Sequence, residues 1–130
     1  MTTRAPRRLP DGGARAARRR SERHGHTAEH IAALVLVLRG YRILGRRQKT
    51  PLGEIDLIAV RGRRVAFVEV KRRSTQEAAE SALTSAQRTR IRRAAGLWLA
   101  RNARYQAHEI GFDLVLIAGR RWPRYLRDAL

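Results

Sequence analysis

Hydrophobic residues follow a helical period in one early segment of the chain. Thr27 is placed to cap a helix, and Gly40 follows the segment as a stop signal. The core stripe is expected at spacings of three and four residues, formed by Ile31, Leu34, Val35 and Leu38. The opposite face, with Ala33 and Leu36, is also apolar, so we expect this helix to be covered on two sides.

After Gly40 the period changes to two, which predicts strands. We expect a short strand at Tyr41–Leu44, a basic connection at Arg46–Pro51 and a second strand at Gly53–Val60. Gly62 and Arg63 then form a two-residue hairpin turn that leads into a third strand, Arg64–Lys71.

A second helix and a fourth strand complete the pattern. Thr84 or Ser85 caps the helix, which runs to about Asn102 with an inward stripe of Ile91, Ala94, Ala95, Trp98 and Leu99. The apolar run Ile110–Ile117 predicts a strand that is buried on both faces. The order helix, three strands, helix, strand predicts an α/β domain with a mixed sheet flanked by helices.

The flanking segments lack this patterning. Residues 1–23 hold eight arginines, two acidic residues and little large apolar surface, which predicts a flexible basic arm or a leader without a role. The domain is expected over residues 24–121. Residues 122–130 have no clear period and are expected to form a C-terminal tail.

Charge indicates the kind of partner. The chain has 29 basic and 11 acidic residues, a net charge of +18, which favours a polyanion and nucleic acid above all. Cysteine is absent, which excludes disulfide scaffolds, thiolate metal sites and thiol catalysis. The longest apolar run, Ile31–Leu38, is far below the roughly 20 residues of a membrane span, so we expect a cytoplasmic protein with no membrane contact.

Acidic residues in the predicted hairpin point to chemistry. A two-residue turn at Gly62 places Asp56 opposite Glu69 and Glu54 opposite Lys71. Two carboxylates held that close repel each other unless a proton or a cation lies between them. The structural alternative is a cross-strand ion pair on an exposed face, which the apolar residues of that face disfavour.

Sparse oxygen ligation is what Mg²⁺ prefers, because the ion keeps waters and binds phosphate oxygens. Such a metal polarises a phosphodiester and readies a water for attack, while Lys71 balances the added negative charge. His24, His26 and His30 lack a clear further ligand, so a solvated or DNA-facing cluster is favoured over a metal site.

Several segments resemble a known family. The stretches GHTAEHIAA (25–33), GYRIL (40–44), GEIDLIA (53–59), FVEVK (67–71) and GFDLVLI (111–117) are similar to the YraN family, small bacterial proteins placed in the PD-(D/E)XK nuclease superfamily with archaeal Holliday-junction resolvases. The resemblance implies a restriction-endonuclease-like αβββαβ core. The sequence departs from the family pattern at two positions. Gln87 stands where many members have Lys. Gly111 stands where Arg usually precedes Phe-Asp, so Asp113 lacks that arginine as a neighbour.

The resemblance also implies a role for each candidate site residue. Asp56 and Glu69 would be metal ligands together with the backbone carbonyl of Val70, Lys71 the catalytic lysine, and Glu29 the helix acid that completes the site. Glu54 belongs to the GEID motif and is included among the catalytic residues. The cofactor would be Mg²⁺, with Mn²⁺ as a substitute. Resolvases of this fold are often dimers, and the apolar far side of the first helix is one candidate interface.

We therefore expect a metal-dependent endonuclease that hydrolyses phosphodiester bonds in structured or branched DNA. The residues expected to contact nucleic acid are Arg72, Arg73, Gln87, Arg88 and Arg92. The first alternative is a non-catalytic nucleic-acid-binding module of the same fold that serves DNA repair or recombination. A basic structural RNA-binding protein is a third possibility, which leaves the acidic cluster unexplained. Asp113, in an apolar strand, is interpreted as a structural hydrogen-bond acceptor.

Overall fold

A computed structural model describes residues 26–73 and 84–130, so the predicted arm at 1–23 lies outside the described residues. The elements in chain order are a helix at 26–38, β1 (Arg42–Thr50), β2 (Gly53–Arg61), β3 (Arg64–Arg73), α3 (Ser85–Arg101), the short 3₁₀ helix η1 (Ala103–Tyr105), β4 (Glu109–Ala118) and β5 (Arg124–Leu126). None of the helices in this part of the chain has the length and apolar character needed to span a bilayer.

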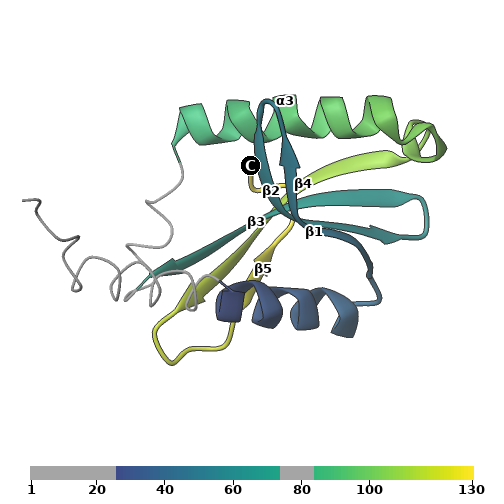
Figure 1. Cartoon of the computed structure of the whole chain (residues 1–130). Helices are drawn as coiled ribbons and strands as arrows, with labels where there is room; N and C mark the ends of the chain where they lie inside the picture. The colour runs from purple at the N-terminus through teal and green to yellow at the C-terminus, as the bar shows by residue number, and fades with distance from the viewer. Residues whose placement is uncertain (1–25, 74–83) are drawn as a thin grey trace, which may run out of the picture.

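The strands form one mixed sheet in the order β1-β2-β3-β4-β5. β3 and β4 are parallel, because α3 lies between them in the chain and crosses over one face, whereas the other neighbours are antiparallel. Figure 1 shows α3 on one face of the sheet and the helix at 26–38 on the other. The predicted fold class is confirmed: a five-stranded mixed sheet flanked by helices, consistent with a restriction-endonuclease-like αβββαβ core.

The β2–β3 hairpin has the register that the sequence predicts. Gly62 adopts a φ of +58°, a conformation that glycine tolerates without strain, and Arg61 pairs with Arg64. The antiparallel ladder continues from this turn to Leu57 and Val68. The turn therefore fixes which side chains of the two strands lie near each other.

The first helix turns a different face to the sheet than its predicted stripe. The stripe is wrong at Leu34 and Leu38, which are 58% and 78% exposed, whereas Leu36 is fully buried. Ile31, also in the predicted stripe, is partly buried and packs against the core. Small residues on the inward face, Ala28 and Ala32, let the helix approach the sheet closely, and their contacts form a cluster with Leu57, Ala59, Ala66 and Val68. A helix that is apolar all round does not reveal its inner side by period alone.

Both ends of this helix are also defined. Thr27 lies inside the helix, which already includes residue 26, so the predicted cap at Thr27 is wrong. The predicted stop is confirmed, because the helix ends at residue 38 and Gly40 follows with a φ of +88°.

Two segments predicted to be irregular join the sheet. The connection at Arg46–Pro51 was not expected to be a strand, yet β1 runs through it from Arg42 to Thr50 and pairs with β2. An edge strand tolerates such charged residues because one side of it faces solvent. The segment expected to form a tail at 122–130 supplies β5 and buries Leu130 near α3.

α3 follows its prediction closely. Thr84 is the N-cap, and a capping box joins it to Gln87: the Thr84 hydroxyl accepts from the Gln87 N–H at 3.2 Å, and Gln87 Oε1 accepts from the Thr84 N–H at 3.0 Å. The buried residues are Ile91, Ala94, Ala95 and Trp98. Trp98 packs edge-on against Phe67 of β3, with ring centroids 5.7 Å apart.

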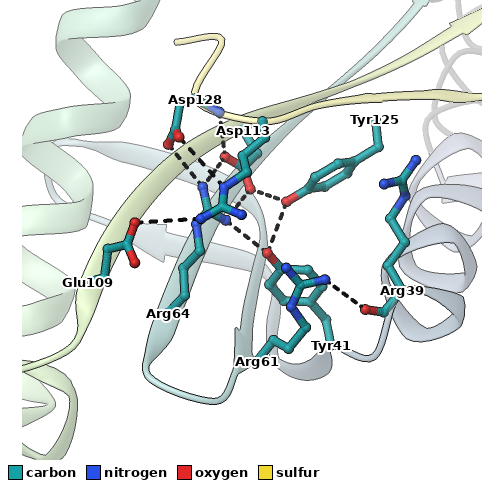
Figure 2. A network of polar contacts seen from close by, with 9 residues as sticks. Arg39, Tyr41, Arg61, Arg64, Glu109, Asp113, Tyr125 and Asp128 are labelled. Carbon is teal, nitrogen blue, oxygen red and sulfur yellow. Dashed lines mark hydrogen bonds and ion pairs between the residues drawn. The ribbon is translucent and has the colours of Figure 1, made fainter.

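A buried polar network ties the sheet together at one end (Figure 2). Arg64 donates to both carboxylate oxygens of Asp113 at 2.7 Å and to the Tyr41 hydroxyl at 2.9 Å. Asp113 also accepts from the Tyr125 hydroxyl and from the Asp128 N–H, the latter at 2.9 Å. Asp113 is fully buried, and its structural interpretation is confirmed.

Arg64 supplies the neighbour that Asp113 was expected to lack. Its guanidinium lies directly over Gly111, so that a Cβ built on Gly111 would overlap it. Although burial favours the neutral acid, hydrogen bonds from Arg64, Tyr125 and the Asp128 N–H lower the pKa of Asp113. The pair is therefore charged and fully satisfied at the acceptor end.

Candidate active site

The candidate site begins where the β2–β3 ladder stops. The last pair of the ladder is Leu57 with Val68. Just beyond it, Asp56 Oδ2 accepts a hydrogen bond from the backbone N–H of Val70 at 2.8 Å. A β2 side chain thus contacts the β3 backbone, which fixes the Asp56 carboxylate at the end of the hairpin.

The side-chain alternation of β2 is interrupted at the same place. Ile55 and Ile58 pack in one cluster under α3, although strict alternation would send them to opposite faces. Leu57 and Ala59 pack in the other cluster, against the first helix. Asp56 therefore sits at a local irregularity in an otherwise regular strand.

Glu69 and Lys71 form a buried ion pair beside Asp56. Lys71 Nζ lies 3.2 Å from Glu69 Oε1, and the two side chains are 11% and 7% exposed. Burial and then the charge of Asp56 raise the pKa of Glu69 to about 7, against the opposing effect of Lys71. Burial also raises the pKa of Asp56, which the hydrogen bond from Val70 counteracts. The structure thus brings together the two acids that the predicted register pairs, just beyond the last observed pair of the ladder.

Glu29 reaches the same region from the first helix. Its side chain is 13% exposed, and its Oε2 lies 3.6 Å from Arg47 Nε. Burial raises the pKa of Glu29, Arg47 lowers it, and the charge of Asp56 raises it further. The helix acid and the hairpin acids are therefore electrostatic neighbours across two elements.

Glu54 lies at the rim and does not oppose Lys71. Its strand partner is Lys49 of β1, and its Oε1 is 3.4 Å from Arg47 Nε. The expected cross-strand pair of Glu54 with Lys71 is wrong, because the β2–β3 ladder ends before Glu54 is reached. The charge of Glu54 still acts on Asp56, whose pKa it raises.

Arg47 is the site residue that sequence reasoning missed. It bridges Glu29 and Glu54 and contacts the imidazole of His26. Its φ of +47° is uncommon for a residue with a side chain. The segment was expected to be a connection, and nothing in its pattern indicates a left-handed residue within a strand.

Two histidines of the first helix contact arginines. His30 Nδ1 lies 3.1 Å from Arg46 Nη1, and His26 contacts Arg47. Across residues 26–73 and 84–130, no group of three or more His, Cys, Asp or Glu side chains is arranged to hold a metal ion. His24 lies outside the described residues.

A smaller donor set fits a hard divalent cation. Asp56 and Glu69 offer carboxylate oxygens, and the carbonyl of Val70 is a third oxygen donor on the same short segment. Mg²⁺ is commonly bound by one or two carboxylates plus waters and substrate phosphates, so it does not need a complete protein cage. Burial is the main cause of the raised pKa of both acids, and the charge of Asp56 adds to it at Glu69, so a bound cation would favour their ionised forms.

The residues expected to contact nucleic acid fall into two groups. Arg72, Arg73 and Arg88 are exposed, the first two directly after Lys71 at the end of β3. Gln87 closes the capping box of α3, and Arg92 donates to the Leu130 carbonyl at 2.6 Å. The last two side chains thus have contacts within the protein itself.

Comparison with known proteins identifies relatives along nearly the whole chain. A UPF0102 protein of Methylorubrum extorquens (strain PA1) is 50% identical over 119 residues, covering 92% of this chain and 91% of the relative. One of Chelativorans sp. (strain BNC1) is 50% identical over 115 residues, with coverage of 88% and 93%. One of Rhizobium meliloti (strain 1021) is 49% identical over 107 residues, with coverage of 82% and 88%.

The family model that matches is described as "Uncharacterised protein family UPF0102", and it covers residues 28–117. These residues include most of the first helix, the β2–β3 hairpin with its acids, and most of β4. The membership that the YraN-like segments indicate is thereby confirmed. The chain belongs to the uncharacterised protein family UPF0102.

Proposed function

We propose that this protein is a metal-dependent DNA endonuclease of the PD-(D/E)XK type, acting in the cytoplasm on structured or branched DNA. The observation that carries the proposal is the buried cluster at the end of the β2–β3 hairpin: Asp56 fixed by the Val70 N–H, and Glu69 paired with Lys71 at 3.2 Å. Burying Glu69 and Lys71 beside the partly buried Asp56 costs stability, which favours a functional reason for these groups.

Asp56 and Glu69, with the carbonyl of Val70, would hold Mg²⁺ or Mn²⁺. When bound, the ion supplies Lewis-acid polarisation of a phosphodiester and favours the ionised form of a bound water. The Lys71 ammonium group, held beside Glu69, would balance negative charge that develops on a bound phosphate. Glu29, an electrostatic neighbour of Asp56, would accept a hydrogen bond from the attacking water.

The positive charge around the cluster supports a nucleic-acid substrate. Arg72 and Arg73 are exposed directly beyond Lys71, and Arg46 and Arg47 flank the acids on β1. Arginines attract phosphates without regard to sequence. A protein that only binds DNA or RNA needs these arginines but gains nothing from buried carboxylates that repel phosphate, so the acids favour hydrolysis.

Cleavage assays test the proposal. Purified protein is incubated with duplex, flap, four-way-junction and single-stranded DNA in Mg²⁺ or Mn²⁺, beside Asp56→Asn and Lys71→Met. Glu109→Gln is a matched control, because Glu109 is an exposed acid at the start of β4. We expect the control to cleave and both site variants to lose cleavage.

Two outcomes contradict the proposal. Cleavage retained by both site variants indicates a contaminating nuclease and refutes the site. Tight DNA binding without cleavage of any substrate identifies the protein as a non-catalytic module of the same fold.

A further inference from the structure

Trp122 is exposed on the turn that joins β4 to β5. Its side chain is 91% exposed, the highest value among the large apolar side chains that the structure describes. The indole ring has a large apolar surface, and leaving that surface in water is unfavourable. Single exposed apolar residues are common on proteins, so the surroundings of Trp122 decide whether its exposure has a function.

The turn at 119–123 has a defined backbone. The Arg121 N–H donates to the Ala118 carbonyl at 3.1 Å, and the Gly119 N–H donates to the Arg73 carbonyl at the end of β3, also at 3.1 Å. Pro123 follows Trp122 and restricts the Trp122 backbone to extended conformations. The backbone that carries the indole is therefore ordered before a ligand binds, which lowers the entropy cost of binding.

The surroundings of the turn are basic. Residues 118–127 contain four arginines and no acid, and Arg120 is exposed directly beside Arg121 and Trp122. Arg72 and Arg73 are exposed at the end of β3, which the turn contacts. Figure 1 shows the end of β3 and the β4–β5 turn at the same end of the sheet. An exposed aromatic ring among arginines is typical of surfaces that bind single-stranded nucleic acid.

The register of the sheet relates this turn to the candidate active site. Lys71 of β3 pairs with Leu116 of β4, and Leu116 also pairs with Arg124 of β5. The Lys71 and Arg124 backbones therefore lie level with each other, two strand spacings or about 10 Å apart. Trp122 precedes Arg124 by two residues, which adds about 7 Å toward the end of the sheet. A bound DNA strand spans such a separation with about four nucleotides, at about 3.4 Å each.

We propose that Trp122 stacks on an unpaired base of the DNA substrate, while Arg72, Arg73 and Arg120 contact the phosphates of the same strand. The bases of a continuous duplex are already stacked on one another, so only unpaired bases offer a face to the indole. The surface would thus select DNA with a single-stranded segment near the candidate active site. The choice of DNA rests on the proposed function, whereas stacking itself requires only an unpaired base.

An anionic membrane surface is the other partner that tryptophan and arginine side chains suit. The unpaired base is favoured because the turn lies close to a candidate phosphodiester site. In addition, Trp122 is the only large apolar side chain of the turn that is exposed, whereas segments that lie in a membrane surface bury a wider apolar face. Lipid vesicles are therefore included in the experiment.

Binding is measured in EDTA by the anisotropy of dye-labelled oligothymidylate. Relaxed closed circular DNA, which has no ends, serves as the competitor that reports duplex binding. Trp122→Ala is compared with Trp122→Phe, which keeps an aromatic face, and with Leu38→Ala, which removes an exposed apolar side chain from the first helix. Arg72→Gln/Arg73→Gln is compared with Arg42→Gln/Arg63→Gln, which removes two exposed charges near the opposite end of the sheet.

We expect Trp122→Ala to weaken oligothymidylate binding by at least about fivefold, because a base–aromatic stack is lost. Its salt dependence and its duplex affinity should not change, since no charge is removed. Trp122→Phe should bind more tightly than Trp122→Ala, and Leu38→Ala should bind like the unmodified protein. Arg72→Gln/Arg73→Gln should instead flatten the salt dependence by about 0.7 per phosphate contact removed, relative to its control. Oligothymidylate should also quench tryptophan emission, and Trp122→Phe should abolish that quenching.

Equal affinity of Trp122→Ala and Leu38→Ala for oligothymidylate would overturn the stacking role, as would an equal loss of single-strand and duplex binding in Trp122→Ala. Binding to phosphatidylglycerol vesicles that Trp122→Ala abolishes, with unchanged oligothymidylate affinity, would assign the turn to a lipid surface instead. These titrations do not depend on cleavage, because EDTA removes the metal. Absence of cleavage with the expected titrations refutes the nuclease alone, and cleavage with unchanged affinity in Trp122→Ala refutes the stacking role alone.

Discussion

The guanidinium of Arg64 occupies the space over Gly111 that a side chain would fill. An ideal Cβ on Gly111 would overlap Nη2 and Cζ of Arg64 and lie 2.8 Å from Nη1. Because Arg64 is held by Asp113 and is itself buried, it has no free path away from such a Cβ. The glycine and the ion pair therefore depend on each other.

Gly111→Ala should destabilise the protein by about 3 kcal/mol, since the added methyl group disrupts a buried charge pair. Urea denaturation measures the loss. Gly62→Ala is a useful contrast, because no atom lies within 4 Å of a Cβ there and only the backbone conformation is strained. A loss below about 1 kcal/mol for Gly111→Ala would show that Arg64 can move aside.

An arginine at position 111 should replace the function of Arg64. Position 111 lies two residues before Asp113 on the same strand face, so a long side chain there reaches the carboxylate. We expect Arg64→Ala/Gly111→Arg to be more stable than Arg64→Ala alone. The control, Arg64→Ala/Gly111→Met, restores the bulk of the side chain without its charge. Equal stability of the two double variants would show that an arginine at position 111 does not replace Arg64.

The Asp113 pair should contribute to acid unfolding. The pKa of Asp113 is lower in the folded chain than its usual value of 3.8, so its stabilisation is complete above that pH and is lost as the pH falls toward the folded pKa. Asp113→Asn should cost about 3 kcal/mol at neutral pH and remove this part of the acid transition. Denaturant titrations from neutral pH to about pH 2 measure both effects. An unchanged acid transition in the variant would disprove the assignment.

Metal binding should weaken in acid because protons compete for Glu69. Its pKa of about 7 means that the carboxyl is increasingly protonated below neutrality and then cannot act as a ligand. The affinity for Mn²⁺ should fall by up to about tenfold per pH unit below about pH 7. Calorimetric titration of the protein and of Glu69→Gln measures this slope, and an equal slope in both excludes Glu69 as the ligand that titrates.

Paired truncations test the orientation of the first helix. Leu36→Ala should cost about 2–5 kcal/mol because Leu36 is fully buried, whereas Leu38→Ala should stay within about 0.5 kcal/mol. Thermal or urea denaturation compares the two variants. Equal losses would place both side chains in packed surroundings.

The role of Gln87 in the capping box can be distinguished from a role in DNA binding by comparing Gln87 with Thr84, its capping partner. Thr84→Ala and Gln87→Ala each remove one hydrogen bond of the same capping box, so each should cost about 1 kcal/mol of stability. If Gln87 acts only in the cap, the two variants bind DNA equally. Weaker DNA binding in Gln87→Ala alone would support the DNA contact that the sequence predicts.

The hairpin acids were predictable because a tight turn leaves little freedom of register. Once Gly62 fixes the turn, Asp56 must come near Glu69, and the structure confirms it. The place of Glu54 was not predictable in the same way. The β2–β3 ladder ends at Leu57, and Glu54 pairs only with β1. Register arguments hold only as far as the strands remain paired.

Other features depend on tertiary packing that leaves no periodic signal. The first helix has apolar residues on both sides, and the small size of Ala32 rather than the bulk of Leu38 selects the buried face. β5 is short and its residues are half exposed, so its place in the sheet comes from contacts such as that of Tyr125 with Asp113. The left-handed conformation of Arg47 likewise has no signal in the sequence pattern.

The network around Asp113 also sets an order for completing the fold during synthesis. Arg64 is available early, but the Tyr125 hydroxyl and the Asp128 N–H emerge from the ribosome after all of β1 to β4. Until then a carboxylate that is fully buried in the native state lacks part of its hydrogen bonding. A nascent chain that stops short of these residues should therefore remain open at this end of the sheet, and release of the segment from Tyr125 to Asp128 becomes the step that commits the domain to its native state.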